Sequence, residues 1–190
     1  MLNNECLGVV LAGGLSTRMG QDKAKLAYKN TDMLNFSQQL LLDSGINNVV
    51  ISGNHYQVPD KFKNAGPVGG IYSVIEQYQP SAILVLPVDL PLMKPSGLTQ
   101  LRLTGEMSQK ACFFEDNNIP LYLPNNGYLE LFLSKEFRQF NASECHTKKN
   151  GPSIKALLNQ IPHMSIKPQQ NRWLFNSNTP EQWEQAKTMC

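Results

Sequence analysis

The chain has 190 residues, of which 41% are hydrophobic and 17% are charged, and its formal net charge at pH 7 is +2. These values predict one soluble globular domain over residues 1–190, with a sizeable core. The small net charge argues against a protein that binds nucleic acid or another polyanionic surface.

The cysteines and the apolar runs point to a cytoplasmic protein. The four cysteines are scattered without a CxxC pair, which argues against a zinc site or a disulfide framework. The N-terminus has none of the features of a signal peptide, and no apolar run approaches the roughly 20 residues of a membrane helix. We therefore expect no membrane partner.

The N-terminal stretch combines the features of a phosphate-binding loop. An apolar, β-branched run predicts a buried strand over Cys6–Ala12. Gly13 and Gly14 follow, and they permit a sharp turn whose peptide N–H groups can bind an anion. Arg18 and Lys23 add positive charge. The simplest ligand for this combination is a polyphosphate.

The spacing within this loop excludes several large enzyme classes. Neither the GxxxxGK[ST] pattern nor the GxGxxG pattern can be drawn through its glycines, which argues against kinases, ATPases and dehydrogenases. The paired glycines alone would fit a purely structural βα turn equally well. The two cations and the third glycine, Gly20, favour a ligand-binding loop instead.

In the first half of the chain, the hydrophobic periodicity predicts a βαβ unit. The predicted elements are a short extended piece at Leu26–Tyr28, a helix over Met33–Ser44, a strand over Asn48–Ser52, an irregular segment over Asn54–Ala65, a glycine turn at Gly66–Gly70 leading into a helix through Tyr78, and a buried central strand over Ala82–Leu86.

The second half of the chain has a weaker pattern. It predicts strands over 111–114, 121–123 and 172–175, and helices over 127–137 and 153–160. A last helix begins at Thr179, which is placed as an N-cap with Pro180 at the first helical position and Gln182 positioned for a capping box.

Strands that alternate with helices predict a three-layer α/β/α, Rossmann-like fold with a mostly parallel central sheet. Ligands bind such sheets beyond the carboxyl ends of the strands. Four polar segments follow predicted strands, so we expect them to converge on one edge: the glycine loop, the segment that begins at Ser52, the turn that contains Asp89, and the segment Asn176–Asn178.

Three of these candidate sites have structural alternatives. Asp89 follows the most apolar strand and could hold Mg²⁺ against phosphate oxygens, or could simply cap a turn before Pro91; the adjacent phosphate loop favours the metal. Asn176 and Asn178 share one side of an extended segment, but turns also favour such residues. The glycines of Gly66–Gly70 could permit close packing or expose backbone to a ligand.

The first loop, L-A-G-G-x-S-x-R-M-G-x-D-K from Leu11 to Lys23, resembles the signature of the molybdenum cofactor guanylyltransferase family, a branch of the nucleotidyltransferases. Weaker likenesses follow in the family's order along nearly the whole chain, at Gly66–Gly70, Pro87–Pro91, Pro120–Tyr122, Gly151–Leu158 and Phe175–Pro180.

The resemblance implies a nucleotidyltransferase fold and a Mg²⁺-dependent transfer of GMP. GTP and molybdopterin (Mo-molybdopterin) would yield the guanine dinucleotide cofactor and pyrophosphate. The resemblance also implies transient contacts with other cofactor-synthesis proteins and with acceptor molybdoenzymes. Positioning and charge neutralisation are the main tasks of a protein in such chemistry.

The resemblance also implies roles for individual residues. The catalytic set is Arg18, Lys23 and Asp89, and Asp89 is the Mg²⁺ ligand. The nucleotide-binding set is Leu11, Ala12, Gly13, Gly14, Lys23, Ser52, Asp60 and Asp89. The second-substrate set is Gly66, Gly69, Asn176 and Asn178.

The chain departs from the family pattern in one region. The segment between Asn54 and Gly66 is shorter than is usual in the family, Asp60 is the best match there to the family's acidic guanine contact, and His55 stands where arginine is common. Two alternatives therefore stay open: a nucleotidyltransferase with another base or acceptor, such as a CTP-dependent enzyme, and a catalytically silent nucleotide-binding regulatory module.

Overall fold

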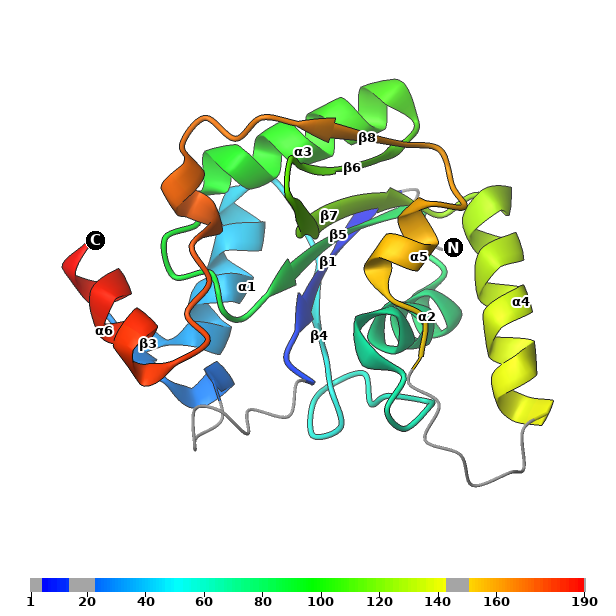
Figure 1. Ribbon diagram of the computed structural model, residues 1–190, viewed down its shortest axis with the longest axis horizontal. Coiled ribbons are helices and arrows are strands. Elements are labelled where there is room, and N and C mark those ends of the chain that lie inside the picture. The colour runs from blue at the N-terminus through cyan, green and yellow to red at the C-terminus, as the bar shows by residue number, and fades with distance from the viewer. Residues whose placement is uncertain (1–4, 14–22, 143–150, 190) are drawn as a thin grey trace.

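The computed structural model describes residues 5–13, 23–142 and 151–189. A six-stranded sheet lies at the centre with helices on both of its faces (Figure 1). This arrangement confirms the predicted three-layer α/β/α fold. Among the described residues, no helix is both long enough and apolar enough to span a membrane.

The secondary structure elements are numbered in chain order. The strands are β1 (Cys6–Leu11), β2 (Ala27–Tyr28), β3 (Thr31–Asp32), β4 (Val49–Ser52), β5 (Ala82–Pro87), β6 (Ala111–Phe114), β7 (Asn117–Pro124) and β8 (His163–Ile166). The helices are α1 (Met33–Asp43), α2 (Gly66–Tyr78), α3 (Pro95–Ser108), α4 (Gly127–Ala142), α5 (Ile154–Leu158) and α6 (Pro180–Thr188), and two 3-10 helices are η1 (Lys23–Lys25) and η2 (Asn171–Leu174).

The central sheet is mostly parallel, as predicted. Its strand order is β4-β1-β5-β7-β6-β8, and β1 pairs in parallel with both β4 and β5. Strand β7 runs antiparallel to both of its neighbours, β5 and β6, while β8 is parallel to β6. Strands β1, β4 and β5 therefore end at the same edge of the sheet, where ligands bind in folds of this kind.

The core lies in two layers, one on each face of the sheet. Successive side chains of a strand point to opposite faces, so Val9 packs with α2, α4 and α5, while Val10 packs with α1 and α3. Ile83 and Leu84 of β5 divide in the same way. This two-sided burial explains why β1 and β5 are continuous apolar runs.

Two predicted elements are wrong in type. The glycine turn predicted at Gly66–Gly70 is the first part of α2 itself, which begins at Gly66 with Pro67 in its first turn. The strand predicted over 172–175 is the 3-10 helix η2, which buries Trp173 against Gly97 of α3. Helix α3 and strand β8 were not predicted.

Candidate active site

The loop that follows β1 packs against the end of β4. The Ala12 N–H donates to the Ser52 carbonyl at 2.9 Å, which extends the pairing of the two strands. A Cβ atom on Gly13 would lie 3.3 Å from the Gly53 Cα and 3.3 Å from Asp60 Oδ2. The two backbones therefore approach closely because glycine is present, and the Asp60 carboxylate reaches this junction.

Ser52 and Asp60 supply polar atoms beside the same junction. The Ser52 hydroxyl is buried and has no hydrogen-bond partner within the described residues. A Cβ on Gly70 of α2 would lie 2.7 Å from this hydroxyl and 3.6 Å from Asp60 Oδ1. A larger residue at position 70 would therefore crowd the Ser52 hydroxyl. Burial raises the pKa of the Asp60 carboxyl above its ordinary value.

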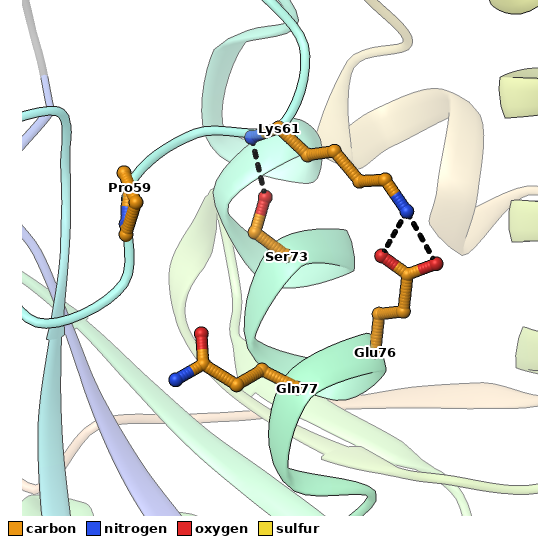
Figure 2. Close-up of a pocket in the computed structure, with 5 residues that line it drawn as sticks. All are labelled: Pro59, Lys61, Ser73, Glu76 and Gln77. Carbon is orange, nitrogen blue, oxygen red and sulfur yellow. Dashed lines mark hydrogen bonds and ion pairs between the residues drawn. The ribbon is translucent and has the colours of Figure 1, made fainter.

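Helix α2 holds the segment that carries Asp60. Figure 2 shows a pocket beside α2, lined by Pro59, Lys61, Ser73, Glu76 and Gln77. The Lys61 N–H donates to Ser73 Oγ at 3.0 Å, and the Lys61 ammonium pairs with the Glu76 carboxylate (Figure 2). These bonds therefore tie the residue after Asp60 to α2.

Lys23, Asp89 and Asn178 form a second group, drawn from distant parts of the chain. Lys23 Nζ lies 3.5 Å from Asp89 Oδ2 and donates to Asn178 Oδ1 at 2.5 Å. The N–H of Ser177 donates to the Asp89 carbonyl at 3.0 Å, and its hydroxyl donates to the same oxygen at 3.3 Å. The segment before α6 therefore contacts both charged residues.

The surroundings of Asp89 suit a hard cation. Its side chain is 22% exposed, and burial raises the pKa of the carboxyl despite the opposing effect of the Lys23 ammonium. Oxygen Oδ1 is buried without a hydrogen-bond partner in the described part of the chain. Carboxylate oxygen is the preferred protein ligand of Mg²⁺, so this oxygen fits the expected metal.

The protein would supply few ligands to such an ion. No group of three or more His, Cys, Asp or Glu side chains gathers anywhere in residues 5–13, 23–142 and 151–189. Magnesium in nucleotide sites is commonly held by one or two carboxylates, with water and substrate phosphates as its other ligands. The observed donor set fits that pattern.

The structure brings together many of the residues predicted for the site. Leu11, Ala12, Gly13, Ser52 and Asp60 lie at the ends of β1 and β4 or beside them. Lys23, Asp89 and Asn178 form the second group. Gly14 and Arg18 lie outside the described residues, so their assignments stay predictions.

The residues predicted for the second substrate divide into different environments. Gly66 is exposed, with a φ of 64° and nothing within 4 Å of the position of a Cβ. Gly69 is buried, and a Cβ there would lie 2.4 Å from the Ala65 Cβ, so close packing explains this glycine. Asn176 is exposed, whereas Asn178 holds Lys23. Substrate contact by all four stays a prediction.

Sequence reasoning missed two residues that support the site. Ser177 is buried and donates to the Asp89 carbonyl, whereas the residues predicted for the site in this segment were its neighbours Asn176 and Asn178. The Tyr28 hydroxyl donates to the Pro91 carbonyl at 2.7 Å and so fixes the turn after Asp89. The sequence carries no signal for the Tyr28 contact.

Comparisons with known proteins place the chain in a family. Residues 8–148 match the family model described as MobA-like NTP transferase domain. The chain is 34% identical over 183 residues to a molybdenum cofactor guanylyltransferase of Xanthomonas euvesicatoria pv. vesicatoria (strain 85-10), covering 93% of this chain and 91% of that protein. A protein of the same name from Campylobacter jejuni subsp. jejuni serotype O:6 (strain 81116 / NCTC 11828) is 27% identical, and the alignment covers 97% of each chain.

A solved structure shows a similar fold. Molybdopterin-guanine dinucleotide biosynthesis protein A from Archaeoglobus fulgidus superposes with a TM-score of 0.73 at 19% sequence identity. The superposition covers 97% of this chain and 98% of that one. At this identity the likeness shows the fold alone.

Proposed function

Because this chain belongs to the family of MobA-like NTP transferase domains, we propose that it transfers GMP from GTP to the molybdopterin cofactor. The products are the guanine dinucleotide form of the cofactor and pyrophosphate. The observation that carries the proposal is the pair of Lys23 and Asp89 at the edge of the sheet where β1 and β5 end. The match to curated guanylyltransferases along almost the whole chain supports the choice of nucleotide.

The proposed reaction forms one phosphorus–oxygen bond and breaks another. A phosphate oxygen of the acceptor attacks the α-phosphorus of GTP, and the bond from that phosphorus to the bridging oxygen of the leaving pyrophosphate breaks. Charge builds up on the leaving oxygens, so fixed positive charge and in-line positioning are the main requirements.

The described residues can meet these requirements. The backbone from Leu11 to Gly13 lies at the end of β1 and would line the nucleotide. Lys23 would bind a phosphate of GTP, because its ammonium is fixed at this edge by Asp89 and Asn178. Asp89 would hold Mg²⁺ through its unpartnered oxygen. When bound, the ion supplies Lewis-acid stabilisation of the phosphate charge.

Asp60 favours guanine as the base. Guanine presents two adjacent donors, the ring N1–H and the 2-amino group, and a carboxylate can accept from both. Cytosine presents an amino donor beside a ring acceptor, which a carboxylate cannot satisfy. The position of Asp60 beside Gly13 and Ser52 therefore supports GTP over CTP.

Thermal unfolding with four nucleotides tests this proposal. We expect GTP with Mg²⁺ to raise the melting temperature most, with smaller effects of CTP, UTP and ATP, since a ligand stabilises the state that binds it. A larger rise with CTP would contradict the guanylyl assignment and favour a nucleotidyltransferase with another base. No rise with any nucleotide would contradict nucleotide binding itself.

A further inference from the structure

Helix α6 begins with a capping box in which one of the two capping side chains also bonds a residue outside the box. Thr179 Oγ1 accepts from the Gln182 N–H at 3.3 Å, and this bond serves the helix alone. Gln182 Oε1 accepts from the Thr179 N–H at 3.1 Å and also from the Asn178 N–H at 2.8 Å. The second bond lies outside the capping box and fixes the residue that precedes the cap.

Asn178 is the residue that holds Lys23. Its side-chain oxygen accepts from Lys23 Nζ at 2.5 Å, while the same ammonium lies 3.5 Å from Asp89 Oδ2. A direct N–H···O bond to a carboxylate is shorter, at about 2.7–2.9 Å. The asparagine therefore holds the ammonium more closely than Asp89 does, and the ammonium forms a longer ion pair with the Asp89 carboxylate.

Helix α6 is itself anchored to the turn that follows Asp89. Trp183 is buried and packs near Tyr28, with ring centroids 5.6 Å apart. The Tyr28 hydroxyl in turn bonds the Pro91 carbonyl. Figure 1 shows α6 beside β3 and α1, away from the other helices that cover the sheet. Gln182 therefore sits on a helix whose place relative to Asp89 is fixed.

From these contacts we propose that Gln182 is a positioning residue, which holds Asn178 so that Asn178 fixes Lys23 beside the Asp89 carboxylate. The inference rests on the proposed function, because it takes Lys23 as the group that binds a phosphate of GTP. Its consequence is that Asp89 keeps one oxygen for a metal ion while Lys23 stays within reach of a phosphate.

The two halves of the capping box provide matched variants. Gln182→Ala removes the bond to Asn178 and half of the capping box, whereas Thr179→Ala removes only the other half. We expect both to lower the melting temperature. Gln182→Ala should also raise the KM for GTP roughly three- to tenfold, while Thr179→Ala changes it by less than about twofold. Gln182→Glu keeps the acceptor and should restore the parental KM.

A double variant separates positioning from helix stability. If Gln182 acts through Asn178, adding Gln182→Ala to Asn178→Ala should leave the KM for GTP unchanged within about twofold. An equal rise in KM in Gln182→Ala and Thr179→Ala would overturn the inference. The inference would also be overturned if Gln182→Ala raised the KM for GTP as much in the Asn178→Ala variant as it does in the parental protein.

Lysine acetylation without nucleotide keeps this test independent of the proposed function. Lys25 is exposed and serves as an internal reference for Lys23. In Gln182→Ala, but not in Thr179→Ala, the acetylation rate of Lys23 relative to Lys25 should rise at least about threefold, because the ammonium loses a fixed partner. An unchanged ratio overturns the positioning role even if the parental protein turns over GTP. Failure of the parental protein to turn over GTP contradicts the proposed function alone.

Discussion

The carboxyl group of Asp89 is the most informative single group in the site. Burial raises its pKa, and the neighbouring Lys23 ammonium offsets only part of this effect. A raised pKa in the folded state means that folding favours the neutral acid. The resulting stability is fully present below the unfolded pKa, and it is lost as the pH rises through the folded pKa. Above its folded pKa, the ionised Asp89 therefore lowers stability.

Replacement of Asp89 by asparagine should separate stability from activity. We expect Asp89→Asn to melt at a higher temperature than the parent at pH 7, with the difference disappearing below the ordinary pKa of aspartate, near pH 4. Turnover of GTP should fall roughly 10²- to 10³-fold, because the proposed metal ligand is weakened. Melting curves across pH and pyrophosphate release test both parts. A lower melting temperature at pH 7, or full turnover, would contradict this account.

Lys23 and Lys25 form a natural pair for mutation, since both lie in η1. Lys23 is part of the site, whereas Lys25 is exposed. We expect Lys23→Ala to weaken GTP binding roughly ten- to hundredfold, because a hydrogen bond to a charged group is lost. Lys25→Ala should bind GTP with the parental affinity. Equal affinities of the two variants in a calorimetric titration would remove Lys23 from phosphate binding.

Asp60 should determine the choice of base. Asp60→Asn replaces one acceptor oxygen by an N–H₂ donor, which conflicts with the two donors of guanine. We expect the ratio of GTP to CTP affinity to fall roughly tenfold or more. Titration of the parent and the variant with each nucleotide measures this ratio. An unchanged ratio would place base recognition elsewhere in the chain.

Much of the site could be predicted from the sequence, because strand ends converge in a parallel sheet. Gly13, Ser52 and Asp89 each follow an apolar run, and this pattern alone brings them to one edge. The contacts of Ser177 with Asp89 and of Tyr28 with Pro91 could not be predicted in this way. They join residues 88 and 63 positions apart, and only tertiary packing brings those residues together.

At the scale of the element, helix α3 was not predicted because glycines occupy part of its buried face. The buried face of α3 is formed by Gly97, Leu98, Leu101 and Gly105, so half of its buried positions carry no side chain. Trp173 and Tyr122 fill the space against these glycines. A search for apolar side chains at helical spacing therefore finds too few of them to predict α3. For η2, a short apolar run around Trp173 resembled a strand because hydrophobic periodicity alone cannot separate a short strand from a short helical segment.

The contact between α3 and β7 gives a prediction for stability. A Cβ on Gly105 would lie 2.0 Å from the Tyr122 ring, so Gly105→Ala requires the helix or the ring to move. We expect a loss of about 1–3 kcal/mol in the free energy of unfolding. Gly127→Ala, at the start of α4, has open space and should not destabilise the protein. Urea unfolding of both variants checks this prediction. Equal free energies of unfolding would contradict it, because they would show that α3 accommodates the added methyl group without cost.

At the scale of the whole molecule, the three parallel strands β4, β1 and β5 form the part of the sheet that carries the site. Alternation of apolar runs with helical patterns was sufficient to predict these strands and the layers around them. The position of β7 between β5 and β6, antiparallel to both, was not predicted, because the pairing of β7 with β5 joins segments that lie far apart in the chain. The solved relative with a TM-score of 0.73 shows that the overall fold is shared at low identity.

The most direct test of the proposed function is product formation by the purified protein with Mo-molybdopterin, Mg²⁺ and one nucleotide at a time. We expect GTP to give pyrophosphate and the guanine dinucleotide cofactor in equal amounts, with neither product formed from CTP or without a divalent cation. Formation of a cytosine dinucleotide from CTP, with no product from GTP, would contradict the account.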